Sequence, residues 1–219
     1  METDYMGIPA SRQINDRIKG LPPGILFSRY DFGNLGLSDE RINTELSRLF
    51  RSTEISRKKR GLYYIPKETP LGPSTISPEQ LAKKMLEESR RIDKKTYGTE
   101  NKSINRLIPA GLTLFNVLGL STQVPARKEY WSTFNLETPT LVVKKMPMEK
   151  WATLTDFELM LYMAIAFLNR VSGENVETVK NKINLIIDDQ QIQTRKLVSL
   201  AKKLRSRVGK NVMDFFPIN

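Results

Sequence analysis

Four consecutive cations, Arg57-Lys58-Lys59-Arg60, stand directly before Gly61 in this chain of 219 residues. Lysine ammonium and arginine guanidinium groups bind phosphate oxygens, and a glycine permits the positive φ of a tight turn. Short apolar segments flank the cations, EIS before them and LYYIP after Gly61, so we expect a hairpin with the charges near its tip. Such a hairpin suits contact with the phosphate backbone of DNA.

The segment before this hairpin, residues 38–51, has the pattern of an amphipathic helix capped by Ser38. Its apolar side consists of Ile42, Leu46, Leu49 and Phe50. On the opposite side, arginine can donate to guanine, and serine, threonine or asparagine can contact other base edges. We expect base contacts from Thr44, Ser47, Arg48 and Arg51, and contacts to the DNA backbone from Arg41, Arg57, Lys58, Lys59 and Arg60.

Positive charge is concentrated in this part of the chain. Residues 41–60 contain seven basic and two acidic side chains, a net charge of +5, whereas residues 1–66 as a whole carry only +3. A structural alternative stays open, in which the helix face is merely solvated and the charged hairpin tip discourages edge-to-edge strand pairing.

The overall composition narrows the classes of function. The formal net charge is +11 and the isoelectric point is about 9.8, which favours a polyanionic partner, and the chain has no cysteine and no histidine. This excludes disulfides, thiolate nucleophiles, serine–histidine–aspartate triads and the usual zinc sites. The start, METDYMGIPAS, does not resemble a secretory signal, and the apolar run at 159–168 is too short to span a bilayer, so we expect a cytoplasmic protein without membrane contact.

The elements expected around the hairpin follow the order of a winged helix-turn-helix domain: helix, strand, helix, helix, strand, strand. Their ranges are 10–19, 25–29, 28–34, 38–51, 54–59 and 62–66. Residues 1–66 would form this domain, and the segment 67–76, which contains Pro70 and Pro73, would be a semi-rigid linker.

Residues 77–219 predict an α-rich α+β domain with a small sheet. Ser77-Pro78-Glu79-Gln80 has the cap, proline and capping-box glutamine that begin a helix, expected to end near residue 92. Further helices are expected near 109–119, 155–169, 175–187 and 190–208, and strands near 127–133 and 138–146. The fold class of the whole chain is therefore α+β.

Several motifs resemble the abortive-infection (AbiEi-like) antitoxin family of type IV toxin–antitoxin systems. In the first half these are Phe27-Ser28, Asp31-Phe32, Leu46-Ser47-Arg48-Leu49 and Arg60-Gly61-Leu62-Tyr63-Tyr64. In the second half, the segment from Ile108 to Ala126, which ends in GLSTQVPA, is similar to that family's signature. The resemblance covers about residues 10–133 and is most specific in GLSTQVPA.

The resemblance implies a winged-helix transcriptional regulator. Such a protein would repress its own operon by binding inverted repeats upstream of it, as a possible homodimer. It would also act as an antitoxin in phage defence, counteracting a nucleotidyltransferase toxin or binding that toxin's RNA substrate. An alternative from the residues themselves is a protein- or RNA-binding module in which the winged helix is a docking scaffold.

Two further surfaces are candidates for partner binding. One is the polar centre of GLSTQVPA, Ser121, Thr122 and Gln123, which could instead form a structural turn. The other is a helix face without acids, whose candidate residues are Arg195, Lys196, Lys202, Lys203 and Arg205. This face could bind nucleic acid or an acidic partner, or it could simply be solvated.

The sequence does not favour an enzyme, and we expect no cofactor and no metal. Asp188 and Asp189 are adjacent, so they point to different sides of a helix, and the Ser-x-x-Lys matches at Ser56 and Ser199 lie in basic stretches where chance predicts them. No phosphate-binding glycine motif occurs. The remaining aromatic residues, Phe115, Tyr130, Trp131, Phe134 and Trp151, could stack on bases or belong to the core.

Overall fold

The computed structural model describes residues 8–97, 104–170, 174–204 and 206–216. The chain forms two compact units, Met1–Arg91 and Ile92–Asn219, each of which contains helices and a small sheet. The predicted α+β class is thus confirmed. The division between the units falls inside the helix α3 (Pro78–Tyr97), and not in the predicted linker at 67–76.

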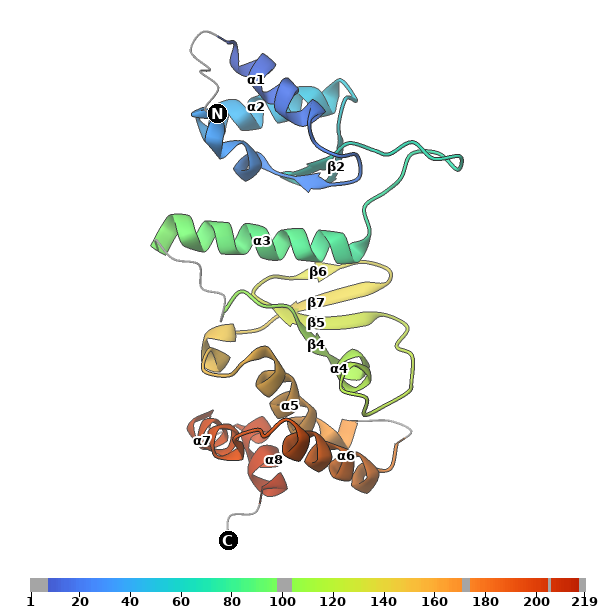
Figure 1. Ribbon diagram of the computed structural model, residues 1–219, viewed down its shortest axis with the longest axis vertical. Coiled ribbons are helices and arrows are strands. Elements are labelled where there is room, and N and C mark those ends of the chain that lie inside the picture. Colours follow the sequence, from blue (N-terminus) through green and yellow to red (C-terminus); the bar gives the residue numbers. More distant parts are fainter. Residues whose placement is uncertain (1–7, 98–103, 171–173, 205, 217–219) are drawn as a thin grey trace. The chain divides into compact units, whose positions relative to one another are not determined.

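The first unit contains a three-stranded antiparallel sheet in the order β1-β3-β2, together with helices (Figure 1). Its elements before α3 are α1 (Ala10–Lys19), β1 (Leu26–Phe27), the 3₁₀ helix η1 (Arg29–Leu35), α2 (Asp39–Arg51), β2 (Ser56–Lys59) and β3 (Leu62–Tyr64). The order of elements is the one that the sequence predicts.

Local side-chain caps begin η1 and α2. Ser28 and Asp31 form a reciprocal capping box at the start of η1, in which the Ser28 amide donates to the Asp31 carboxylate over 2.8 Å. Gly36 ends η1 with a φ of 66°, and the Ser38 hydroxyl then accepts from the Arg41 amide to begin α2. These caps determine the residues at which η1 and α2 begin.

The hairpin of β2 and β3 turns at Arg60 and Gly61, where Gly61 has a φ of 78°. A side chain would be strained in this conformation, which explains the glycine after four cations. The register shifts between Arg57 and Lys59, so the basic strand carries an irregularity beside its turn.

The apolar core of the first unit lies between α1, η1, α2 and the sheet. Ile42, Leu46 and Leu49 of α2 are buried, as the helical pattern predicts. They belong to the same cluster as Phe27, whose ring meets that of Phe32 edge-to-face at 5.9 Å. Burial of this stripe leaves the polar face of α2 in solvent.

A group of four charged side chains, centred on the buried Lys84, attaches α3 to η1. Lys84 donates to Asp31 over 2.7 Å and also lies 3.1 Å from Glu88, while Arg91 donates to the other Asp31 oxygen over 2.7 Å. Burial alone would raise the pKa of Asp31, but hydrogen bonds from Lys84, the Ser28 amide and Arg91 hold it below its ordinary value. These contacts explain why residues 78–91 belong to the first unit.

The second unit contains a four-stranded sheet in the order β4-β5-β7-β6, with a parallel β5–β7 pair between two antiparallel pairs. The strands are β4 (Ile108–Ala110), β5 (Lys128–Ser132), β6 (Leu136–Glu137) and β7 (Leu141–Lys145). The sequence predicted β5 and β7 but missed β4 and β6, because strands of two and three residues have too few side chains to show alternation.

Helices make up the rest of the second unit, and α5 to α8 gather on the β4 side of the sheet (Figure 1). Their bounds are α4 (Gly111–Val117), η2 (Met148–Trp151), α5 (Asp156–Ala166), η3 (Leu168–Arg170), α6 (Val176–Asp189), α7 (Thr194–Leu204) and α8 (Arg207–Phe215). Most of α5 is buried on every side, which accounts for its apolar run.

The single helix predicted over 190–208 is wrong. The chain forms α7 and α8 instead, and the Ser206 hydroxyl caps the second helix by accepting from the Gly209 amide. The two helices pack so closely that a Cβ added to Gly209 would lie 2.6 Å from the Ala201 carbonyl oxygen. Both this close contact between the two helices and the Ser206 cap therefore favour a break between α7 and α8.

Candidate nucleic-acid interface

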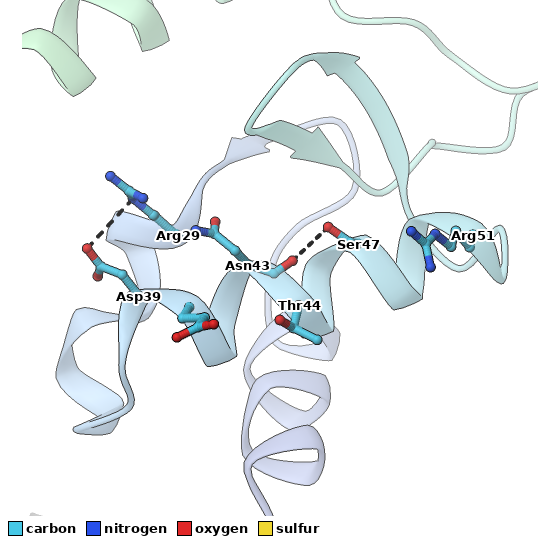
Figure 2. A pocket seen from close by; sticks show the side chains of 7 residues that line it. Arg29, Asp39, Asn43, Thr44, Ser47 and Arg51 are labelled. Atoms are coloured by element: carbon cyan, nitrogen blue, oxygen red, sulfur yellow. Dashed lines mark hydrogen bonds and ion pairs between the residues drawn. The ribbon is translucent and has the colours of Figure 1, made fainter.

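A hollow of about 540 Å³ runs along the polar face of α2. Figure 2 shows the side chains around it, which come from α2 except for Arg29 of η1. The full lining is Arg29, Asp39, Glu40, Asn43, Thr44, Ser47 and Arg51. It thus combines guanidinium donors, an amide, hydroxyls and carboxylates, the groups that bind base edges in the major groove of DNA.

The centre of this face differs from the one that the sequence suggested. At about 100° per residue, Glu40, Ser47 and Arg51 lie within roughly 20° of one line along α2, and Thr44 lies roughly 40° from Glu40. Arg48 lies about 80° from that line. Three of the four predicted base-reading residues therefore line the hollow, and Arg48 does not.

Two carboxylates hold Arg48 on the flank of α2. Its Nε and Nη2 atoms donate to Glu45 over 2.9 and 2.7 Å, and its Nη1 atom lies 3.8 Å from Glu54. The hydrogen bond from Arg48 to Glu45 is the main cause that raises the pKa of the exposed guanidinium. Because its donors are engaged, Arg48 would have to leave these acids before it contacted a base.

Two other residues of the hollow are also oriented by their neighbours (Figure 2). The Ser47 hydroxyl donates to the Asn43 carbonyl over 2.7 Å, so its oxygen remains available as an acceptor. Arg29, which the sequence analysis missed, donates to the Tyr30 hydroxyl and lies 3.9 Å from Asp39. The capping box at Ser28 and Asp31 was the available signal, since it places Arg29 at the start of a helix that precedes α2.

The four hairpin cations have different surroundings. The Arg57 guanidinium lies 4.3 Å from the centre of the Phe50 ring, and the Lys59 Nζ atom is 3.5 Å from the Met85 sulfur. Lys58 and Arg60 are exposed, and within the described parts of the chain they have no ion-pair partner. Arg41, at the start of α2, is also exposed. The hairpin therefore presents cations that a phosphate can reach without displacing an acid.

Part of the candidate partner surface at GLSTQVPA, residues 119–126, forms a structural turn. Ser121 is buried and accepts from the Gln123 amide, so its side chain does not belong to an exposed surface. The Asn116 side chain donates to the Gln123 carbonyl over 2.6 Å and closes the segment. Thr122 is exposed, and Val124 next to the turn is 89% exposed.

The predicted basic face of residues 195–205 is divided by contacts within the second unit. Lys196 donates to both Glu158 oxygens over 2.9 and 2.6 Å and lowers the pKa of that carboxyl against the opposing effect of burial. Arg195, Lys202 and Lys203 are exposed. Arg205 lies outside the described residues.

Among the described residues, no group of three or more acidic side chains is arranged to hold a metal ion. No described helix is long and apolar enough to cross a bilayer.

Of the aromatic candidates for stacking, Phe115 and Trp151 are buried in the core, and the Trp131 ring lies 5.8 Å from that of Phe167.

The molecule is thus an α+β protein whose first unit presents a polar helix face beside a basic hairpin. The chain belongs to a family of unknown function, DUF6088, whose model matches residues 13–194. No curated protein matches it.

Proposed function

We propose that the first unit is a winged helix-turn-helix module that binds double-stranded DNA. In this arrangement η1 and α2 form the helix-turn-helix, α2 enters the major groove, and the hairpin of β2 and β3 is the wing. The observation that carries the proposal is the exposed pair of cations on the hairpin, Lys58 and Arg60, which have no acidic partner among the described residues, in the unit whose α2 bears the mixed polar hollow. Phosphate contacts from the hairpin would supply affinity, and α2 would supply base contacts.

The dimensions of α2 support this role. Its 13 residues span about 20 Å at about 1.5 Å per residue. The stripe from Glu40 to Arg51 spans roughly 16 Å, or about five base pairs at about 3.4 Å each. Thr44, Ser47 and Arg51 would contact bases, Arg57, Lys58, Lys59 and Arg60 would hold phosphates, and Arg41 would approach the backbone at the other end of α2.

The biological role that we propose is transcriptional autorepression combined with antitoxin activity. The support for it is the resemblance of the motifs between residues 10 and 133 to abortive-infection (AbiEi-like) antitoxins, together with the proposed DNA interface. The DNA partner would be the upstream region of the protein's own operon, and inverted repeats there would be bound by a homodimer. A nucleotidyltransferase toxin, or its RNA substrate, would be the partner of the second unit.

A gel-shift titration on the DNA upstream of the protein's own gene tests the interface. The double variant Lys58→Gln/Arg60→Gln should bind more weakly than the wild type, and its log K against log salt slope should be shallower by about 1.8, which is about 0.9 for each lost phosphate contact. The matched control is Lys145→Gln/Lys150→Gln, which removes two exposed charges from the second unit and should leave the slope near that of the wild type. A scrambled duplex measures sequence preference. Equal and weak binding of both duplexes by the wild type would contradict the proposal.

One observation favours a second candidate, a protein-docking module. The face of α2 is not uniformly basic, since Asp39 and Glu40 line its hollow and Glu45 engages Arg48. A basic segment of another protein would fit such a face, with the hairpin as a scaffold. Weak DNA binding that changes little with salt would favour this candidate over DNA recognition.

A further inference from the structure

We propose that Glu40 determines base preference at the N-terminal end of α2, by accepting a hydrogen bond from the amino group of cytosine. The inference rests on the proposed DNA-binding function and names the chemistry of its partner. It concerns a carboxylate, a group that would weaken binding if α2 served only to attract phosphates.

Among the described residues, Glu40 differs from the neighbouring acids Asp39 and Glu45 in having no arginine partner. Asp39 lies 3.9 Å from Arg29, and Glu45 accepts two hydrogen bonds from Arg48. Glu40 is exposed, lines the hollow and, among the described residues, makes no hydrogen bond or ion pair through its side chain. Its carboxylate is therefore available to a ligand without displacing another group.

The position of Glu40 on α2 is that of a base contact. It lies on the same line of the helix as Ser47 and Arg51, and in helix-turn-helix proteins the N-terminal residues of the recognition helix contact base edges. A phosphate would be repelled by this carboxylate, so the approach of α2 favours a base that offers a donor. The hydroxyl of Thr44, one turn further along the hollow, can contact the neighbouring base.

The chemistry of the bases selects cytosine. In the major groove, guanine presents the acceptors O6 and N7, and thymine presents the acceptor O4 and a methyl group. Cytosine presents its N4 amino group, for which glutamate and aspartate are the matching acceptors. Adenine also has an amino group, but its N7 acceptor lies beside it and would repel the second carboxylate oxygen. At the other end of the stripe, Arg51 suits guanine. The expected site therefore has cytosine and guanine about five base pairs apart.

A structural role competes with this inference. A carboxylate in the first turn of a helix interacts favourably with the helix dipole, and Glu40 occupies the second residue of α2. In that case Glu40→Gln would lower the unfolding midpoint slightly but would leave base preference unchanged. The measurement must therefore record preference among sequences and not affinity alone.

The experiment selects bound duplexes from a pool with a randomised central segment, using the full chain as wild type, Glu40→Gln and the control Asp16→Asn on α1. The wild type and the control should enrich cytosine at one position. In Glu40→Gln, the enrichment of cytosine at that position should fall about tenfold. The preferences at the other positions should be unchanged, and random duplexes should be bound more tightly than by the wild type.

Each outcome decides between the hypotheses. If Glu40→Gln enriches cytosine as strongly as the wild type, Glu40 does not read the base, although the DNA-binding proposal stands. If the wild type enriches sequences without cytosine at that end of the site, the base assignment is wrong. If the wild type enriches no sequence and binds no duplex, both the inference and the proposed function fail.

Discussion

Two groups of ion pairs in the first unit each join a cation to two carboxylates, but the two cations differ in burial. On α2, Arg48 is bound by Glu45 and Glu54, and its side chain remains 49% exposed. Below the surface, Lys84 is bound by Asp31 and Glu88, and its side chain is only 8% exposed. An exposed pair contributes little to stability because water competes for both partners, whereas a buried charge that loses its partner is strongly destabilising.

Some charged side chains of the first unit stabilise the fold, whereas others remain accessible to a ligand. The Lys84 group holds α3 against η1 and keeps the Lys84 ammonium and the Glu88 carboxylate away from solvent, although its residues are as polar as those of the hairpin. The Arg48 group can open in solvent, so its guanidinium can exchange a carboxylate for another acceptor. Charge alone therefore does not identify an interface, and burial has to be considered with it.

Replacing Lys84 should have the largest effect on stability. Lys84→Met leaves Glu88 without its closest cation and removes one of the hydrogen bonds to Asp31, so we expect a loss of about 3 kcal/mol in the free energy of unfolding. Urea unfolding followed by circular dichroism measures it. The control is Lys83→Met, one residue earlier on the exposed face of α3, which should change stability little. Equal losses in both variants would contradict the difference drawn between buried and exposed charges.

The pH dependence of the Lys84 group follows from the lowered pKa of Asp31. A carboxyl whose pKa is lower in the folded state stabilises the protein above its ordinary value of 3.8, and this contribution is lost as the pH falls through the lowered pKa. Between about pH 5 and about pH 3, the wild type should therefore lose more stability than Asp31→Asn. Urea unfolding at several pH values tests this. Parallel curves for the two proteins would show that Asp31 is not the group responsible.

Lys196 provides an intermediate case in the second unit. Its ammonium is partly buried against Glu158, so Lys196→Gln should reduce the free energy of unfolding by about 1 kcal/mol. Thermal unfolding of this variant is compared with that of Lys203→Gln, an exposed position on the same helix, where we expect almost no change. A larger effect at Lys203 than at Lys196 would reverse the assignment of structural and solvent-exposed lysines on α7.

The smallest effect on stability is expected at Arg48. Arg48→Gln removes a guanidinium that is 49% exposed and screened by water, so the unfolding midpoint should change little. In the DNA-binding role that we propose, the affinity of Arg48→Gln should fall less than that of Arg51→Gln, because Arg51 lines the hollow and Arg48 lies on the flank. A filter-binding titration with one duplex ranks the two variants. A greater loss of affinity in Arg48→Gln than in Arg51→Gln would show that Arg48, and not Arg51, lies at the centre of the proposed interface.

The sequence by itself determined the elements whose signals are local. The apolar spacing of Ile42, Leu46 and Leu49 predicted α2, and Gly61 after the four cations predicted the hairpin turn. The capping residues Ser38 and Ser77 predicted where two helices begin, and both caps are present. These features depend on neighbours within a few residues, which the sequence displays directly.

Only the tertiary structure decided which of the predicted polar residues are accessible. Lys196 pairs with Glu158, 38 positions away in the chain, Ser121 is buried, and Arg29 joins the hollow from a different helix. The attachment of α3 to η1 joins residues more than 50 positions apart, and no local pattern records such pairs. Burial and charge pairing depend on contacts between distant segments, and these contacts determine whether a charged side chain stabilises the fold or remains available to a partner.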